Sequence, residues 1–162
     1  MARTKYGKYF LSDTGEPPKA NDYVSLNSLP PFPEIASPQT YFRGESALPG
    51  ATASIGWQVF IKPYLLETIP HTHDVDEFLI FLGAKLPDLC SSFKAEIDLW
   101  MGEELEKHII TSTTVVYIPR GLLHCPLNFR KIDEPVLFHA LYLGPRFTAQ
   151  RVKDWDKSKI QF

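Results

Sequence analysis

Short runs of alternating apolar and polar residues follow one another from residue 54 to residue 143. In residues 93–101, every second side chain from Phe93 to Met101 is apolar, and three charged side chains stand between them. Because successive side chains of a strand point to opposite faces, this pattern predicts a strand with one buried face. The same reasoning predicts strands at residues 55–62, 76–82, 93–101, 106–111, 114–118 and 135–143. Turns containing Pro, Gly and Asp separate these strands, which favours an antiparallel sandwich or barrel.

One predicted strand is apolar on both faces. Residues 78–82 read Phe-Leu-Ile-Phe-Leu, so the face that is turned away from the core needs a cover. Three covers stay open: the N-terminal part of the chain, a second copy of the chain, or a loop over the back of a central strand. This strand, together with an aromatic N-terminal arm that needs a surface to lie on, favours a homodimer.

Residues 1–51 differ from the rest of the chain in composition. Half of the 14 prolines lie in the first 50 residues, including Pro17-Pro18 and the run from Pro30 to Pro33. Proline cannot donate a hydrogen bond to a central sheet, and the many aromatic side chains exclude a solvated linker. We therefore interpret residues 1–162 as a single domain. It consists of an extended arm with short edge strands (1–51), a barrel (52–145) and a C-terminal tail (146–162).

The composition is that of a globular domain of ordinary size. Hydrophobic residues make up 44% of the 162 residues and charged residues 22%, which excludes a disordered or fibrous chain. A net charge of −2 provides no basic surface for nucleic acid or anionic lipid. Cys90 and Cys125 are too few for a disulfide framework, and no apolar run suits a signal peptide or a membrane span. We expect a cytoplasmic protein without nucleic-acid or membrane partners.

Candidate chemistry begins just before the strand that is apolar on both faces. His71 and His73 lie two positions apart, so on a strand their side chains project from the same face. Glu77 shares their parity and can join them. Two imidazoles and a carboxylate form a donor set that suits Fe, Mn, Co, Ni, Cu or Zn. Asp74 and Asp76 have the opposite parity and are left out of the set.

A second cluster occupies residues 117–128. Pro119 and Gly121 predict a tight turn, because proline fixes φ and glycine accepts a positive φ. The turn delivers His124 at the start of the next short strand. A third imidazole presented in this way would complete a site of three histidines and one glutamate inside a barrel.

These two clusters resemble the two motifs of the cupin superfamily. Residues 71–77, His-Thr-His-Asp-Val-Asp-Glu, match HxHxxxE, and residues 119–128, Pro-Arg-Gly-Leu-Leu-His-Cys-Pro-Leu-Asn, match PxGxxHxxxN. The resemblance covers roughly residues 52–145 and implies an all-β fold, a double-stranded β-helix or jelly-roll barrel. It further implies that one divalent transition metal is bound by His71, His73, Glu77 and His124. The glycines that usually precede each motif are absent, which affects the turns and not the ligands.

The resemblance does not select a reaction, because this scaffold hosts many chemistries. We expect an enzyme that acts on a small organic acid, a phenolic compound or a sugar at the metal. With iron it would be dioxygenase-like, and with Mn, Zn or Ni it would be isomerase- or lyase-like. The alternative is a non-catalytic sensor or binding module that captures a small ligand in the same pocket. The identity of the metal stays open.

Three further residues have side chains that metal sites or acid–base catalysis use. His139, in the strand predicted at 135–143, is a candidate catalytic acid or base lining the pocket. Cys125 directly follows His124 and is expected to point to the opposite face, as a buried structural thiol. His108 follows a charged turn and is expected on the surface.

Overall fold

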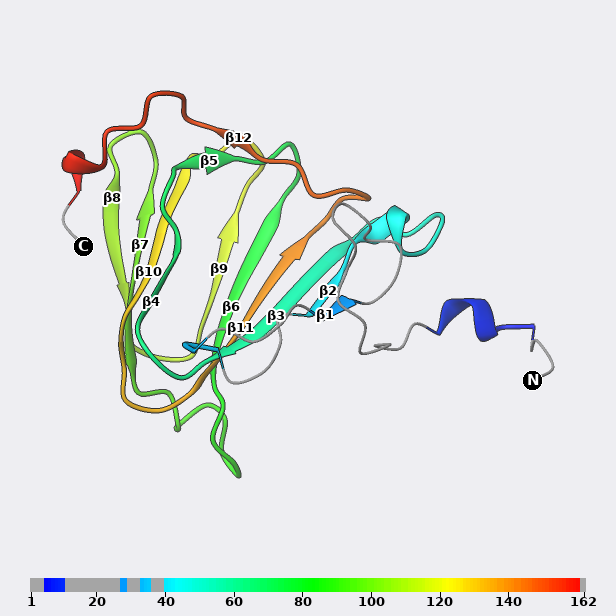
Figure 1. The fold of residues 1–162 in the computed structure, drawn as a ribbon, viewed down its shortest axis with the longest axis horizontal. Helices are drawn as coiled ribbons and strands as arrows, with labels where there is room; N and C mark the ends of the chain where they lie inside the picture. Colours follow the sequence, from blue (N-terminus) through cyan, green and yellow to red (C-terminus); the bar gives the residue numbers. More distant parts are fainter. Residues whose placement is uncertain (1–4, 11–26, 29–32, 36–39, 161–162) are drawn as a thin grey trace.

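The computed structural model describes residues 5–10, 27–28, 33–35 and 40–160, which form two antiparallel six-stranded sheets that face each other (Figure 1). The strands are β1 (Asn27–Ser28), β2 (Thr40–Phe42), β3 (Ser54–Phe60), β4 (Tyr64–Glu67), β5 (His71–Thr72), β6 (Glu77–Gly83), β7 (Ala95–Met101), β8 (Glu106–Ile110), β9 (Thr114–Ile118), β10 (His124–Ile132), β11 (Val136–Tyr142) and β12 (Gln150–Arg151). One sheet has the order β1-β2-β3-β11-β6-β9, and the other has the order β12-β5-β10-β7-β8, with β4 paired to β10.

In the part of the chain that the structure describes, helical structure is limited to short 3-10 turns. The described residues form η1 (Gly7–Tyr9), η2 (Gly44–Ser46) and η3 (Lys157–Lys159). No helix among these residues is long and apolar enough to cross a membrane.

The prediction of an antiparallel all-β sandwich or barrel is confirmed. All the strands predicted from alternation are present, and their ends agree with the prediction to within two residues. β10 was predicted only as a short strand starting at His124, but it continues to Ile132. β4, β5 and β12 were not predicted, because strands of two to four residues are too short to show an alternation.

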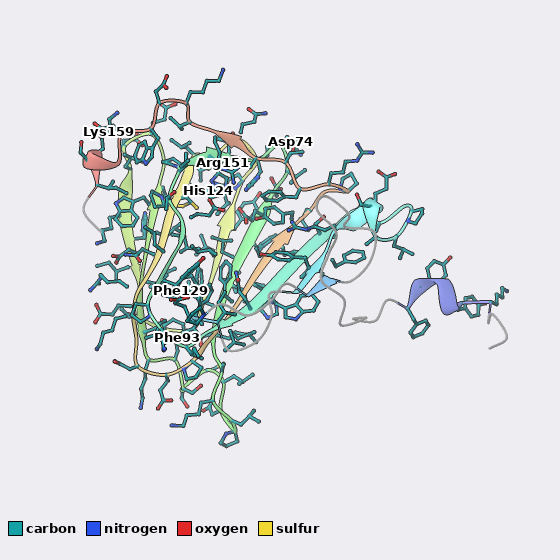
Figure 2. All side chains as sticks on the ribbon, viewed as in Figure 1. Asp74, Phe93, His124, Phe129, Arg151 and Lys159 are labelled. Carbon is teal, nitrogen blue, oxygen red and sulfur yellow. The ribbon has the colours of Figure 1, made fainter. Side chains whose placement is uncertain are left out.

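Aromatic side chains fill one end of the space between the sheets. Phe60 of β3 stacks on Phe129 of β10 with ring centroids 3.9 Å apart, which joins the two sheets. Phe81 and Phe138, from β6 and β11, pack around the same pair. In Figure 2, Phe129 lies toward this end and His124 lies toward the other. The apolar core therefore occupies one end of the sandwich, and the other end is available for polar side chains.

The described part of the N-terminal arm extends the sheet beyond β3. β2 pairs with β3, and β1 pairs with β2. Ile35 is 2% exposed and forms a β-bridge with Phe60, so it closes the edge of the aromatic core. Pro17-Pro18 and residues 30–32 lie outside the described residues.

The outer face of the sheet around β6 is apolar. Phe78, Ile80 and Leu82 are half-buried on this face. On the neighbouring edge strand, Val115 and Tyr117 are 60% and 50% exposed. Among the described residues, no segment fully covers these side chains, which stay partly exposed to water. The expectation that something covers this face therefore stays a prediction.

Candidate metal centre

The two clusters of the sequence meet at one end of the sandwich. His71 in β5 and His124 at the start of β10 lie opposite each other in an antiparallel pair. His73 follows β5 directly, and Glu77 begins β6 in the other sheet. The turn before β10 forms as expected: Gly121 has a φ of 78°, and its N–H donates to the carbonyl oxygen of His73 at 2.8 Å. This hydrogen bond ties the second cluster to the first.

Four side chains converge here, and all of them are removed from solvent. His71, His73, Glu77 and His124 are 4%, 3%, 2% and 2% exposed. The Oε2 atom of Glu77 lies 3.4 Å from Nε2 of His73 and 3.2 Å from Nε2 of His124. The ring centroid of His71 lies 4.8 Å from that of His73 and 4.5 Å from that of His124. The structure therefore brings together all the side chains named as ligands from the sequence.

Backbone carbonyl groups orient the three imidazole rings. Nδ1 of His71 and Nδ1 of His124 each bond to the carbonyl oxygen two residues earlier, at 3.0 Å in both cases. Nδ1 of His73 bonds to the carbonyl oxygen of Thr148. A carbonyl oxygen only accepts, so each Nδ1 carries a hydrogen, and in the neutral ring Nε2 then keeps its lone pair. This is the tautomer that binds a metal through Nε2.

The donor atoms fit a cation. Nε2 of His73 and Oε2 of Glu77 are buried and have no hydrogen-bond partner. Both atoms carry lone pairs, so they repel each other across 3.4 Å unless a positive charge lies between them. Neighbouring ligands of an octahedral ion, with bonds of about 2.1 Å, lie about 3.0 Å apart. Nitrogen and oxygen donors at such a spacing suit a divalent transition metal.

Cys125 also lies at this site, contrary to expectation. Its Sγ and the ring nitrogens of His71 and His124 lie within 4.8 Å of one another. The expectation that Cys125 points away from His124 is wrong, because the register of β10 shifts after His124 and Cys125 has a φ of 73°. The thiol is buried, as expected. Burial raises its pKa well above the usual value, so it is uncharged at neutral pH.

Two aromatic side chains that sequence reasoning missed enclose the histidines. The ring of Tyr142 packs edge-on against His73, with centroids 5.0 Å apart. Phe147 packs against both, 5.4 Å from His73 and 4.8 Å from Tyr142. Burial, followed by the charge of Glu77 and a hydrogen bond to it, raises the pKa of Tyr142 well above its usual value. Alternation groups Tyr142 with Val136, Phe138 and Ala140 on one face of β11, but strand pairing was needed to show that this face is the inner one.

The C-terminal segment, interpreted from the sequence as a tail from residue 146, closes over the site. β12 pairs with β5, and Arg151 lies opposite His71. Thr148 supplies the carbonyl group that orients His73. In Figure 1 this segment is the orange-to-red chain that crosses the end of the sandwich. Phe147, Thr148 and Arg151 of this segment therefore form part of the site, whereas Gln150 is exposed and does not line the cavity.

A cavity of about 190 Å³ opens beside the four side chains. At its lining, the guanidinium of Arg43 lies 4.0 Å from the ring centroid of Tyr41 and 5.6 Å from that of Phe147. Glu67 and Arg151, which also line it, form an ion pair at 3.9 Å. Burial raises the pKa of Glu67. The remaining walls are largely apolar, which suits a small organic ligand.

His139, the candidate acid or base, does not line this cavity. The cavity-lining residues of β11 are those on either side of it, so its ring faces the outside of the sheet, 6.5 Å from the ring of Trp57. The expectation that His139 lines the pocket is therefore wrong, because alternation along β11 puts its side chain on the outer face of the sheet. His108 is exposed on β8, as expected.

Burial also sets the charge state of the histidines. It lowers the pKa of His71 to about 4, and it lowers the pKa of His73 as well. Both rings are therefore neutral at pH 7. Because only a neutral imidazole can bind a metal, neither ring has to lose a proton before it does so.

No family model and no curated protein matches the chain, but solved structures do. A formate complex of Lactobacillus farciminis oxalate decarboxylase is 14% identical, with a TM-score of 0.50, and the match covers 80% of this chain and 34% of that one. An uncharacterized conserved protein with a double-stranded β-helix domain, from Klebsiella pneumoniae subsp. pneumoniae MGH 78578, is 9% identical, with a TM-score of 0.48. This match covers 78% of this chain and 91% of that one. An oxalate oxidase in complex with the substrate analogue glycolate is 13% identical, with a TM-score of 0.49, and the match covers 90% of this chain and 64% of that one.

The chain has the cupin fold. The predicted double-stranded β-helix is thereby confirmed. The match spans 34% of the oxalate decarboxylase and 64% of the oxalate oxidase, so the likeness concerns part of each of those proteins. A fold by itself does not define a reaction, so the function of this cupin-fold chain has to be argued from its own site.

The lowered pKa of His71 predicts a pH dependence for the stability of the metal-free protein. As pH falls below about 6.5, the unfolded chain takes up a proton at His71, while the folded chain does so only near pH 4. Stability linked to His71 is therefore fully present above pH 6.5 and is lost as pH falls toward 4. Urea unfolding of chelator-treated protein should show that His71→Gln loses about 3 kcal/mol less than wild type between pH 7 and pH 4.

His108→Gln is the matched control, because it makes the same substitution at an exposed histidine. It should follow the wild-type pH dependence. A parallel loss of stability in wild type, His71→Gln and His108→Gln would contradict the prediction and would mean that His71 is accessible to protons in the folded state.

Proposed function

We propose that this chain is a metal-dependent enzyme in which one divalent transition metal, Fe, Mn, Zn or Ni, is held by His71, His73, Glu77 and His124. Its substrate is a small organic acid, a phenolic compound or a sugar. The observation that carries the proposal is the pair of buried lone-pair atoms, on His73 and Glu77, that face each other without a hydrogen-bond partner. They do so beside a cavity large enough for a small molecule.

A divalent metal at these ligands would supply Lewis acidity to a bound substrate oxygen, or a redox centre in the case of iron. The protein groups around it have separate tasks. Tyr142 keeps its proton at the phenol oxygen and offers a hydrogen-bond donor next to the Glu77 carboxylate. Phe147 covers His73 and reduces the access of water to the ligands. The carbonyl of Thr148 holds the ring of His73 in a fixed orientation.

The first test of this proposal is metal content. His71→Ala, His73→Ala and His124→Ala should each lower metal affinity about 10-fold or more, because each variant removes one donor. His108→Ala should leave the metal content unchanged, because this ring is exposed on β8. The measurement is elemental analysis of full-length protein purified without a metal-affinity step. Full metal content in His124→Ala would mean that the second cluster supplies a turn and not a ligand.

The second test is turnover. The protein is reconstituted separately with Fe(II), Mn, Ni and Zn, and O2 uptake and product formation are followed on small diketones, phenolic acids, hydroxy acids and sugars. Glu77→Gln removes the ligand charge and keeps the side-chain volume. It should therefore lower turnover about 10-fold or more, while the unfolding midpoint changes little. If ligands raise the melting temperature but no metal form consumes them, the chain is a sensor or binding module instead.

We also propose that the chain forms a homodimer through the outer face of the sheet that contains β6 and β9. The apolar side chains of Phe78, Ile80 and Leu82 are half-buried there, and those of Val115 and Tyr117 are exposed. A stable dimer has to bury about 1,200 Å² or more in total, and an apolar sheet face is suited to that.

Light scattering at micromolar concentration should therefore give the mass of a dimer. Val115→Lys, on the proposed interface, should shift the protein toward the monomer. Ile109→Lys, at a 55% exposed position on the other sheet, is the matched control and should stay dimeric. A wild-type monomer would contradict the proposal and would favour a segment of the same chain as the cover.

A further inference from the structure

Gln58 is a polar side chain at an otherwise apolar position. It lies on the inner face of β3, is 5% exposed and lines the cavity beside the candidate metal centre. Its Oε1 atom is buried and has no hydrogen-bond partner. A buried acceptor without a partner costs about 1–3 kcal/mol. A leucine of similar size would avoid this cost, so the stability of the fold gives no reason for a glutamine here.

The strand register places Gln58 at the far end of the cavity from Glu77. Across the sheet, Glu77 pairs with Tyr142, and Tyr142 pairs with Ser54. Gln58 lies four residues further along β3, which corresponds to about 13 Å of strand. It pairs with Phe138. Gln58 therefore lies between the metal end of the cavity and the aromatic core of Phe60, Phe81, Phe129 and Phe138.

Two small residues and the ring of Tyr41 line the space between these two ends. Gly56 and Ala140 face each other in the intervening register position, and both line the cavity. The ring of Tyr41 lies so close to Gly56 that a Cβ on this residue would come within 2.7 Å of the ring. Leu66 and Leu127 contribute the opposite wall. The middle of the cavity is therefore narrow and apolar, and its two ends are polar.

We propose that Gln58 recognises the far end of the substrate by accepting a hydrogen bond from a hydroxyl group. This inference rests on the proposed function, which assigns the near end of the substrate to the metal. The substrate class is a small acid with three parts: a chelating head, a short apolar or aromatic spacer, and a terminal hydroxyl.

The size of the cavity agrees with this class. Its volume of about 190 Å³ equals about six water molecules at 30 Å³ each, which suits a molecule of the size of a small aromatic acid. The cationic groups that line the cavity each contact another side chain. Arg43 lies over Tyr41, and Arg151 pairs with Glu67.

The test compares ligands that share a head and differ only in the terminal hydroxyl. The pairs are 4-hydroxymandelate with mandelate, and 5-hydroxy-2-oxopentanoate with 2-oxopentanoate. Calorimetric titration of the Mn(II)-loaded full chain should give at least 10-fold tighter binding of the hydroxylated member in at least one pair, since the analogue without it leaves Oε1 unpaired. Gln58→Leu should abolish this preference by weakening only the hydroxylated member. Its melting temperature should equal or exceed that of wild type.

Gln150→Leu is the matched control, because it makes the same substitution at an exposed position in β12. It should keep the preference. Gln58→Met provides a second variant of similar volume if the leucine variant is poorly folded, and it should behave as expected of Gln58→Leu. The proposal is overturned if Gln58→Leu weakens both members of a pair equally, if the preference survives in that variant, or if wild type loaded with metal binds neither member of either pair.

The same titrations on chelator-treated protein separate this proposal from the proposed function. A protein that takes up no metal but still prefers the hydroxylated ligand, in a manner that depends on Gln58, would support the role of Gln58 and refute the metal-dependent enzyme. A protein that takes up metal at the four ligands and shows no such preference would refute the role of Gln58 and leave the metal site standing.

Discussion

The repulsion between lone pairs at the candidate metal centre is the constraint on which the arrangement of this end of the molecule depends. Nε2 of His73 and Nε2 of His124 both face Oε2 of Glu77, at 3.4 Å and 3.2 Å, and all three side chains are almost completely buried. Without a cation these atoms would separate if their side chains were free to turn. They stay together because carbonyl groups hold the opposite ring nitrogens, and because β5, β10 and β12 are joined in one sheet. The folded protein thus contains an unfavourable cluster of acceptors that a divalent ion would make favourable.

The rest of the interior is arranged around this cluster in layers. Aromatic rings, led by the Phe60–Phe129 stack, fill the end of the sandwich away from the ligands and make it rigid. In the middle layer, Gly56 makes room for the ring of Tyr41 and Ala140 has a small side chain, and Gln58 places a polar group beyond them. The rigid aromatic core at one end of the cavity and the oriented histidine rings at the other give a ligand two fixed points of contact. This pre-organisation lowers the entropy lost on binding, which is what a selective binding or catalytic site requires.

Particular residues show how far the sequence alone leads. The alternation in residues 93–101 predicted β7 because strand geometry has a period of two. The same rule predicted that His71, His73 and Glu77 share one face of a strand, but His71 lies in β5 and Glu77 begins β6 of the other sheet, so these side chains meet across the sandwich. The rule was wrong for Cys125, because the register of β10 shifts after His124 and Cys125 takes a positive φ. It could not assign His139 to the inner or the outer face, because both faces of the neighbouring strand β6 carry apolar residues. Pairing with β3 and β6 decided that question, and His139 lies outside.

The sequence by itself determined the all-β class, the main strands and the donor types of the candidate site, because these follow from local alternation and from motif spacing. Only the tertiary structure decided which side chains surround the ligands. Tyr142, Phe147 and Thr148 reach His73 from β11 and from the segment after it, about 70 residues away in the chain, and Gln58 reaches the same cavity from β3. Such contacts depend on the pairing of β12 with β5 and of β11 with β3 and β6. Local periodicity does not predict which strands pair, because pairing is selected by the burial of the whole core.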